Sequence, residues 1–286
     1  MAIIVEPINP VAFSVFGLPI RWYALAYIGA FIIGFFMMKY LTSRKDSEIT
    51  LSKKQMDDFL SYFVFGVILG GRLGYVLFYN LPFFLAHPLE IFALWHGGMS
   101  FHGGFIGVIV ATLLFVKNQK FTTGSFGQNS FRILDILAVL SPIGLGLGRI
   151  ANFINMEVMG RATNSPLGIV FVGQTDIPRH PSPLYEAALE GVALFVIMWA
   201  LYWKTNLRKH AGALSGVFCI LYAIFRIFCE QFRQPDEQIG FLTSWGLTMG
   251  MTLSALVFIT GVVVLVFSLK GRKRKNMKFM KNDSEG

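Results

Sequence analysis

Long apolar runs recur along the chain and are separated by short segments that hold most of the charged residues. A helix needs roughly 20 predominantly apolar residues to cross the hydrocarbon core of a bilayer. Windows of about this length predict an all-α integral membrane protein built as a bundle of seven transmembrane helices. The predicted spans are residues 21–41, 57–79, 98–117, 133–154, 183–203, 212–230 and 246–269.

The composition excludes an ordinary soluble domain. Hydrophobic residues make up 54% of the chain and charged residues only 14%, whereas soluble domains contain about 25% charged residues. We therefore expect one transmembrane domain over residues 1–270, which includes an outer segment at 156–182. A short basic tail at 271–286 follows it, and we place this tail in the cytoplasm.

Lysine and arginine are distributed unevenly between the loops. The loops after the first, third and fifth predicted spans are basic, as is the tail, whereas the alternate loops contain only Arg161, Arg179 and Arg233. Cytoplasmic loops are enriched in these residues, so we predict a cytoplasmic C-terminus and an N-terminus outside. The net charge of +9 fits this topology and contact with anionic membrane lipids. We find no nucleic-acid-binding motif.

Charged residues inside the predicted spans are the first candidates for chemistry. The segment LYAIFRIFCEQFRQPD places Tyr222, Arg226, Glu230 and Arg233 on one stripe of a helix, at positions i, i+4, i+8 and i+11. Such residues are costly in hydrocarbon unless they have partners. Two interpretations stay open, namely a structural ladder of ion pairs and a cavity in which Arg226 holds an anion.

The second predicted span contains a similar outlier in the segment GGRLGYVLFYN. Arg72, Tyr75 and Tyr79 lie on one helix face. Arg72 either pairs with Glu186 or Glu190 during assembly or binds a substrate, and the pattern does not decide between these roles.

Glycine pairs surround Ser100 and His102 in the segment WHGGMSFHGGFIGV, and they disfavour a continuous helix there. We expect a break followed by a helix that starts near Gly103, with His102 at its N-terminus. The positive end of the helix dipole favours anions and a neutral imidazole. His102 is then either a packed hydrogen-bonding residue or a proton acceptor.

The segment GRIANFINMEVMGR ends the fourth predicted span with several polar residues. Arg149 and Asn152 share one helix face and Glu157 lies beside it. Glu186 and Glu190, four residues apart in the fifth span, require cations in an apolar environment. We therefore predict one buried polar chamber toward the outer leaflet.

Several arginines in one chamber suit a phosphate group, because a guanidinium donates two parallel hydrogen bonds to it. In a membrane this favours a phospholipid substrate. Neither the histidines and acidic residues nor Cys219 and Cys229 have the spacing of metal ligands, so we expect no metal and no other cofactor.

Five segments of the chain closely resemble the bacterial prolipoprotein diacylglyceryl transferase family. The resemblance extends from about Trp22 to the end of the seventh span. The family signature, Gly-Arg-x-Gly/Ala-Asn-x-x-Asn-x-Glu-x-x-Gly, is matched by Gly148, Arg149, Ala151, Asn152, Asn155, Glu157 and Gly160. The resembling segments are GGRLGYVLFYN, HGGMSFHGGFIGV, GRIANFINMEVMGR, RHPSPLYE and FRQPDEQ.

This resemblance implies an enzyme of lipoprotein biosynthesis. The family transfers the sn-1,2-diacylglyceryl group of phosphatidylglycerol to the lipobox cysteine of a prolipoprotein signal peptide. A thioether forms and glycerol phosphate is released. The resemblance further implies a multi-pass protein of the bacterial inner membrane, with a periplasmic N-terminus and an active site toward the periplasm.

The resemblance also implies roles for individual residues. His102 matches the family's essential histidine, which we interpret as the base for the substrate thiol. Arg149 and Arg226 match its critical arginines, which we expect to hold the phosphate. The further predicted substrate-binding residues are Tyr23, Arg72, Asn152, Glu157, Tyr222, Glu230 and Arg233.

A phospholipid flippase or transporter is the alternative, because such proteins also use broken helices and buried charges near the bilayer midplane. Repeated halves would favour it, and we find none in the sequence. A purely structural membrane protein would keep the ion pairs without a lipid cavity. An intramembrane hydrolase is disfavoured, because neither G-x-S-x-G nor H-E-x-x-H is present.

Overall fold

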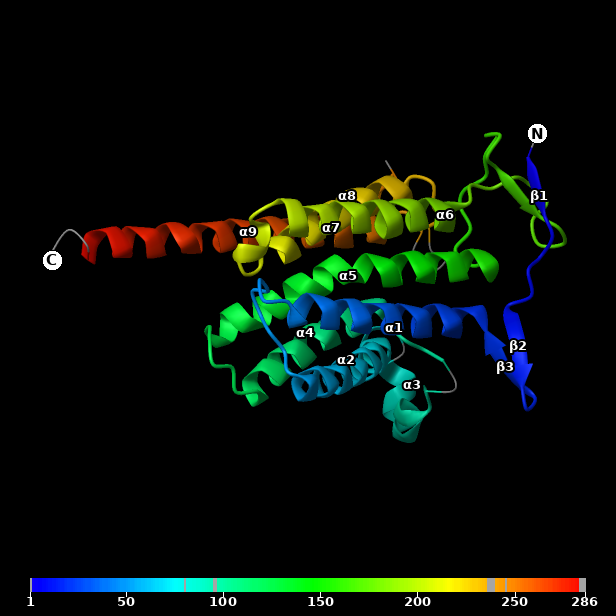
Figure 1. The fold of residues 1–286 in the computed structure, drawn as a ribbon. Coiled ribbons are helices and arrows are strands. Elements are labelled where there is room, and N and C mark those ends of the chain that lie inside the picture. Colours follow the sequence, from blue (N-terminus) through cyan, green and yellow to red (C-terminus); the bar gives the residue numbers. More distant parts are fainter. Residues whose placement is uncertain (1, 80, 95–96, 236–239, 245, 283–286) are drawn as a thin grey trace. The chain divides into compact units, whose positions relative to one another are not determined.

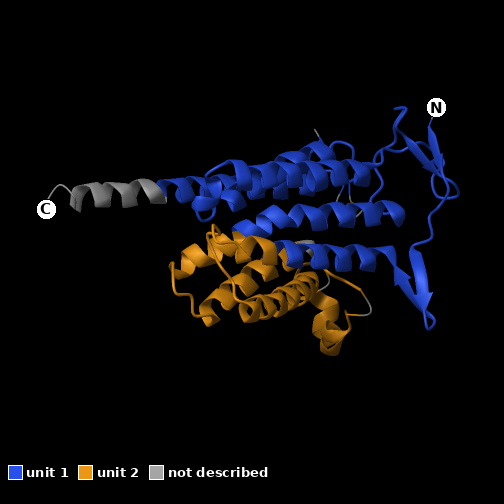
Figure 2. Cartoon of the chain, in the orientation of Figure 1, with its two compact units in different colours: residues 1–38, 135–286 blue, residues 39–134 orange. Residues whose placement is uncertain are grey.

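The computed structural model describes residues 2–79, 81–94, 97–235, 240–244 and 246–282, except for the side chains of Phe101 and of residues 271–282. It contains two compact units (Figure 2), which are residues 1–38 with 135–286 and residues 39–134. The helices (Figure 1) are α1 Trp22–Ser43, α2 Lys53–Tyr79, α3 Leu81–Ala86, η1 Pro88–Phe92, α4 Phe101–Asn118, α5 Phe126–Ile154, α6 Ser182–Glu186, η3 Ala187–Ala193, α7 Leu194–Lys204, η4 Leu207–Lys209, α8 Ala213–Glu230 and α9 Met249–Asn282.

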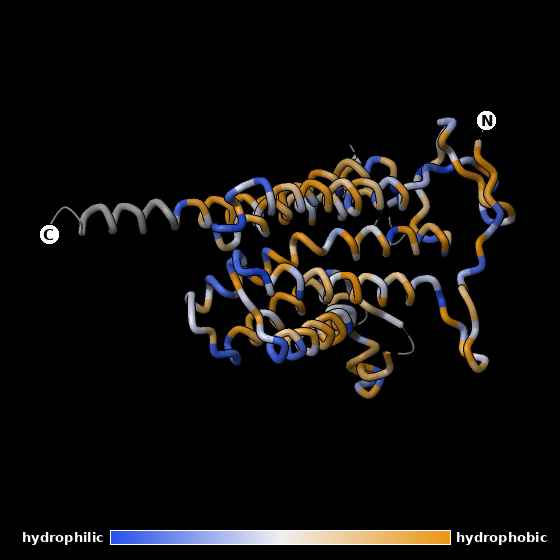
Figure 3. Tube along the Cα trace, viewed as in Figure 1, coloured by the Kyte–Doolittle hydropathy of each residue, from blue (hydrophilic) through white to orange (hydrophobic). Residues whose placement is uncertain are grey.

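The predicted helical membrane architecture is confirmed. Each of the seven predicted spans coincides with a helix, and six helices of the described chain are long and apolar enough to cross a membrane. The third predicted span is the shorter apolar helix α4. Apolar residues predominate along the long helices (Figure 3). The side of the membrane on which each terminus lies stays a prediction, as does the division into a domain of residues 1–270 and a tail. The backbone of α9 continues to Asn282.

Four short strands accompany the helices, and the sequence pattern did not predict them. Strand β1 (Ile3–Val5) pairs in parallel with β4 (Ile169–Phe171), and β2 (Val11–Val15) pairs antiparallel with β3 (Leu18–Arg21). The strands are rich in β-branched and aromatic residues. A three-residue strand whose partner lies far along the chain leaves too short a local pattern to recognise.

In the unit of residues 39–134, glycines let α2 and α4 pack backbone against backbone. A Cβ atom at Gly66 would lie 2.7 Å from the Gly107 carbonyl oxygen, and one at Gly74 would lie 2.6 Å from Gly103 Cα. Small residues give membrane helices this close approach. The glycines that interrupt the third predicted span are therefore its packing surface.

In the larger unit, a buried carboxylate of one helix caps the N-terminus of another helix. Asp135 of α5 is 4% exposed. It accepts hydrogen bonds from the backbone N–H of Gly212 at 2.7 Å and from the N–H and hydroxyl of Ser215, each at 2.7 Å. These are amides at the start of α8, which have no partner within that helix. Asp135 therefore acts as an N-terminal cap supplied by a different helix.

We predict that Asp135→Ala lowers the free energy of unfolding by about 1–3 kcal/mol, because it leaves buried donors without an acceptor. Thermal unfolding of the purified protein in detergent measures the effect. Asp46→Ala is the control, since Asp46 pairs with Arg44 at an exposed position and such pairs contribute about 0–1 kcal/mol. Equal stability of the two variants would contradict the capping role.

Candidate functional site

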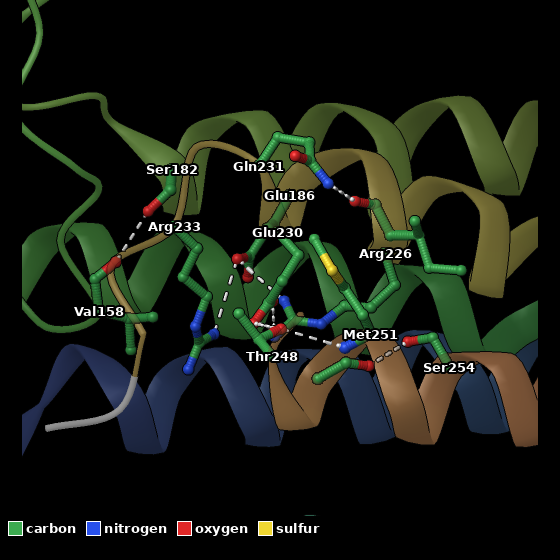
Figure 4. A network of polar contacts seen from close by, with 12 residues as sticks. Val158, Ser182, Glu186, Arg226, Glu230, Gln231, Arg233, Thr248, Met251 and Ser254 are labelled. Carbon is green, nitrogen blue, oxygen red and sulfur yellow. Dashed lines mark hydrogen bonds and ion pairs between the residues drawn. The ribbon is translucent and has the colours of Figure 1, made fainter. Parts of the chain in front are cut away.

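The predicted stripe of charged residues near the end of α8 forms a ladder of ion pairs. Arg226 Nη2 lies 2.8 Å from Glu230 Oε2, one helical turn further on. Helix α8 ends at Glu230, so Arg233 lies in the segment after it, where its backbone bridges to Gly160. The side chains still point toward one another across the helix end (Figure 4).

Glu186 is the centre of this ladder, because three arginines contact its carboxylate. Glu186 Oε2 lies 2.7 Å from Arg149 Nε, and its Oε1 lies 3.0 Å from Arg226 Nη1 and 3.6 Å from Arg233 Nη1. The Glu186 side chain is 0% exposed. A single buried carboxylate of α6 thus connects α5, α8 and the segment that follows α8.

Glu190 joins the same network from a π-helical turn. Helix α6, the π-helix η3 and α7 follow one another without a gap. Glu190 Oε2 lies 3.5 Å from Arg149 Nη2, and its Oε1 lies 3.6 Å from Arg226 Nη1. Such π-helical turns occur frequently at functional sites. The expectation that Glu186 and Glu190 require cations is confirmed.

We call Arg149, Arg226, Arg233, Glu186, Glu190 and Glu230 the arginine–glutamate cluster. Its formal charges cancel. The glutamate side chains are 0%, 0% and 5% exposed, whereas those of Arg149, Arg226 and Arg233 are 20%, 11% and 15% exposed. The carboxylates are therefore the inner layer, and the accessible edge of the cluster is positive.

The polar residues at the end of α5 have partners of their own. The exposed Glu157 carboxylate accepts hydrogen bonds from the amide of Asn152 at 3.0 Å and from that of Asn155 at 3.3 Å. Met156 and Val158 adopt positive φ angles of 55° and 58°, which are uncommon for residues with side chains. Strained backbone on both sides of Glu157 thus ends the helix and places its carboxylate against the two amides.

The outer segment is joined to the cluster by hydrogen bonds from side chains to backbone carbonyls. Arg161 donates from Nε to the carbonyl of Arg233 at 2.9 Å and from Nη2 to the carbonyl of Glu230 at 3.3 Å. The Ser182 hydroxyl donates to the Val158 carbonyl at 2.9 Å. Burial lowers the pKa of His180, which packs nearby between aromatic rings. The hydrogen bonds donated by Arg161 and Ser182 hold the ends of α5 and α8 and the start of α6 together.

The predicted tyrosines lie in the same unit as the cluster. Tyr222 stacks on Phe218, with 5.9 Å between ring centroids, and lies within electrostatic reach of Glu190 and Arg226. Tyr23 packs against Tyr27 at 5.1 Å. Tyr27, which the sequence did not indicate, interacts electrostatically with Arg149 and Glu157.

Arg72 has a different environment, because its hydrogen bonds in the described structure go to backbone carbonyls. The guanidinium donates to the carbonyls of Ile91 at 2.8 Å and of Gly98 and Ala93 at 3.2 Å each, and also to those of Glu90 and Gly97. It therefore holds the segment before α4. A role in substrate binding stays a prediction.

His102 lies at the start of α4, as predicted from the glycine pairs. The helix begins at Phe101, and the Ser100 hydroxyl caps it by accepting a hydrogen bond from the Gly103 N–H at 3.2 Å. The Ser100 N–H donates to the Gly71 carbonyl at 2.8 Å, which attaches this helix start to α2. The side chain of His102 is exposed.

Glu186 and Glu190 are the cluster residues missing from the predicted site, although both had been noted as needing cations. The available signal was two carboxylates four residues apart in an apolar segment. Within the described residues, no group of three His, Cys, Asp or Glu side chains is placed to hold a metal ion. The chemistry that the described site offers is charge stabilisation by guanidinium groups and the binding of an anion.

Comparison with known proteins identifies similar sequences over nearly the whole chain. The family model for prolipoprotein diacylglyceryl transferase matches residues 10–267. The phosphatidylglycerol–prolipoprotein diacylglyceryl transferase of Methylocella silvestris is 46% identical over 266 residues, which cover 92% of this chain and 94% of the relative. The corresponding protein of Nitrobacter hamburgensis is 48% identical over 263 residues, 90% of this chain and 87% of the relative.

We predict that Glu186→Gln lowers the free energy of unfolding by about 3–5 kcal/mol, because it leaves buried guanidinium groups without full compensation. Thermal unfolding in detergent is the measurement. Glu48→Gln is the matched control, since Glu48 lies 3.6 Å from Arg132 and both side chains are partly exposed. Comparable unfolding temperatures for the two variants would show that Glu186 is not the structural centre of the cluster.

Proposed function

Since the chain belongs to the prolipoprotein diacylglyceryl transferase family, we propose that its arginine–glutamate cluster binds the phosphate of phosphatidylglycerol. The protein is an enzyme that transfers the diacylglyceryl group from phosphatidylglycerol to prolipoproteins. The observation that carries the proposal is the layered charge of the cluster, with buried carboxylates behind partly accessible guanidiniums.

The reaction replaces a carbon–oxygen bond with a carbon–sulfur bond. The thiol of the lipobox cysteine loses its proton, and the sulfur attacks the glyceryl carbon that carries the phosphate ester. Glycerol phosphate leaves with the electron pair of the broken bond. A free cysteine has a pKa of about 8.5, so a positioned base raises the fraction of reactive thiolate.

Arg149 and Arg226 are suited to the charge that develops on the leaving phosphate. Arg149 contacts glutamates through Nε and Nη2, and Arg226 does so through Nη1 and Nη2. Arg149 Nη1 and Arg226 Nε take part in none of these pairs. The carboxylates thus orient both guanidiniums before the lipid arrives, and donors oriented in advance need no reorganisation during the reaction.

His102 is our candidate for the base that accepts the thiol proton. The proposal is supported by its position at the capped N-terminus of α4 and by its exposed side chain. Tyr23, Arg72, Asn152, Glu157, Tyr222, Glu230 and Arg233 complete the proposed substrate-binding set, as residues that orient the substrates or pair with the arginines.

We place this multi-pass protein in the bacterial inner membrane, with the active site and N-terminus toward the periplasm. The cluster is built from the end of α5, the start of the α6–α7 helix and the end of α8. The loops at these ends contain few lysines and arginines, which is typical of the non-cytoplasmic side. We propose residues 1–270 as the catalytic domain, 271–286 as a cytoplasmic tail, and signal peptides as the protein substrates.

The proposed function requires that the peptide becomes covalently modified. Purified protein with phosphatidylglycerol and a lipobox peptide should add one diacylglyceryl group to the peptide and release glycerol phosphate. Peptide mass and phosphate release report the two products. Arg149→Ala should lower turnover by about 10²–10³-fold, as expected for loss of one charge-stabilising donor.

A peptide with serine in place of cysteine is the negative control, and Arg132→Ala is the matched arginine control, because Arg132 lies in a partly exposed surface pair. Transfer by the intact protein but equal activity of Arg149→Ala and Arg132→Ala would remove Arg149 from the mechanism. Movement of lipid across the bilayer without a peptide product would instead support the flippase alternative.

The second prediction concerns the base. His102→Gln should lower turnover by about 10²–10⁴-fold near neutral pH, and the defect should shrink above pH of about 8.5, where the thiol ionises without help. Turnover measured from pH 6 to 10 tests this. His87→Gln is the control, since His87 stacks on Phe83 at an exposed position. Near-normal turnover of His102→Gln at every pH would exclude the assignment.

A further inference from the structure

The start of α9 makes a direct contact with the cluster that no motif of the sequence indicated. The Thr248 hydroxyl donates to Glu230 Oε1 at 2.9 Å and accepts from the Met251 N–H at 3.2 Å. The same oxygen therefore caps α9 and holds a carboxylate of α8 (Figure 4). Thr248 is only 2% exposed, so water does not readily replace this donor.

Gly250 provides the space in which this carboxylate lies. A Cβ atom at this position would lie 2.6 Å from Glu230 Oε1 and 2.9 Å from Oε2, which is closer than such atoms approach. Glycine inside a helix costs about 1 kcal/mol relative to alanine. At Gly34 of α1, by contrast, a Cβ atom would meet nothing within 4 Å. The close approach of the Glu230 carboxylate therefore requires glycine at position 250, whereas no neighbouring atom requires glycine at position 34.

The Glu230 carboxylate lies against the positive end of α9. Free amides and the positive end of the helix dipole stabilise anions at a helix N-terminus. The residue Glu230 is 4% exposed, and its second carboxylate oxygen lies 2.8 Å from Arg226 Nη2. One oxygen is thus held by Thr248 and the other faces the arginine.

We propose that Thr248 and Gly250 are positioning residues for the transfer reaction and that they act through Glu230 on Arg226. Together they form a seat on α9 that holds the Glu230 carboxylate against the Arg226 guanidinium. Without this seat, the carboxylate partners of Arg226 among the described residues are Glu186 and Glu190, and its guanidinium moves toward them and away from the phosphate. This inference rests on the proposed role of Arg226.

The test compares kcat and KM for phosphatidylglycerol in Thr248→Val, Thr248→Ser and Gly250→Ala, with a lipobox peptide as acceptor. We expect kcat to fall about tenfold in Thr248→Val and Gly250→Ala, with a smaller change in KM, because the seat acts on charge that develops in the transition state. Thr248→Ser keeps the hydroxyl and should restore most of the activity.

Matched controls come from the same kinds of position. Thr260 on α9 donates to the Leu256 carbonyl at an exposed site, so Thr260→Val should keep normal kcat. Gly34→Ala should also do so. Unfolding temperatures of all variants separate a loss of folded protein from a loss of turnover.

A double-mutant cycle tests most directly whether Thr248 acts through Glu230. If Thr248 acts through the Glu230 carboxylate, Thr248→Val should cause little further loss in a Glu230→Gln protein, since interacting residues are not additive. The inference is overturned if the two losses simply multiply, if Thr248→Ser is as slow as Thr248→Val, or if Gly250→Ala behaves like Gly34→Ala.

Arg226→Ala distinguishes failure of this inference from failure of the proposed function. If Arg226→Ala retains normal turnover, the role of Arg226 and the inference built on it are both wrong. If Arg226→Ala is inactive and folded Thr248→Val and Gly250→Ala are fully active, only the seat is excluded.

Discussion

Burial of the Glu186 carboxylate is the constraint on which the cluster depends. Removing a carboxylate from water costs several kcal/mol unless cations and hydrogen bonds compensate for it. Arg149, Arg226 and Arg233 supply the cations from α5, from α8 and from the segment after α8. The hydrophobic effect does not drive helices together within lipid, so these ion pairs contribute to holding the ends of α5, α6 and α8 together.

The same arrangement confirms the ladder interpretation of the α8 stripe, whereas the binding of an anion by Arg226 stays a proposal. The stripe is a structural ladder, because every arginine in it contacts a carboxylate. Its arginines are also more accessible than its glutamates. Under the proposed function, an approaching anion meets oriented guanidinium groups first, while the buried carboxylates balance the charge of these groups. A neutral site also releases an anionic product more readily than a strongly positive one.

Glycine has two distinct roles in this chain. Gly66 and Gly74 of α2 bring its backbone against that of α4, which is a packing role common in membrane helices. Gly250 instead leaves room for a charged side chain. Glycine content alone does not separate these roles, because each role depends on whether backbone or a charged side chain of the neighbouring helix lies opposite the glycine. Gly250 thereby connects a glycine directly to a carboxylate of the arginine–glutamate cluster.

Local spacing and contiguous motifs predict the helical spans, the stripe of Arg226 and Glu230, the break before His102 and the family. Other contacts are visible in the folded structure and not in the sequence pattern. Glu186 contacts three arginines, Arg72 binds backbone carbonyls and Thr248 holds Glu230. The pairing of β1 with β4 is likewise seen only in the folded structure. These contacts join residues far apart in the chain, and many partners satisfy a buried charge equally well until helix packing brings one of them within a few ångströms.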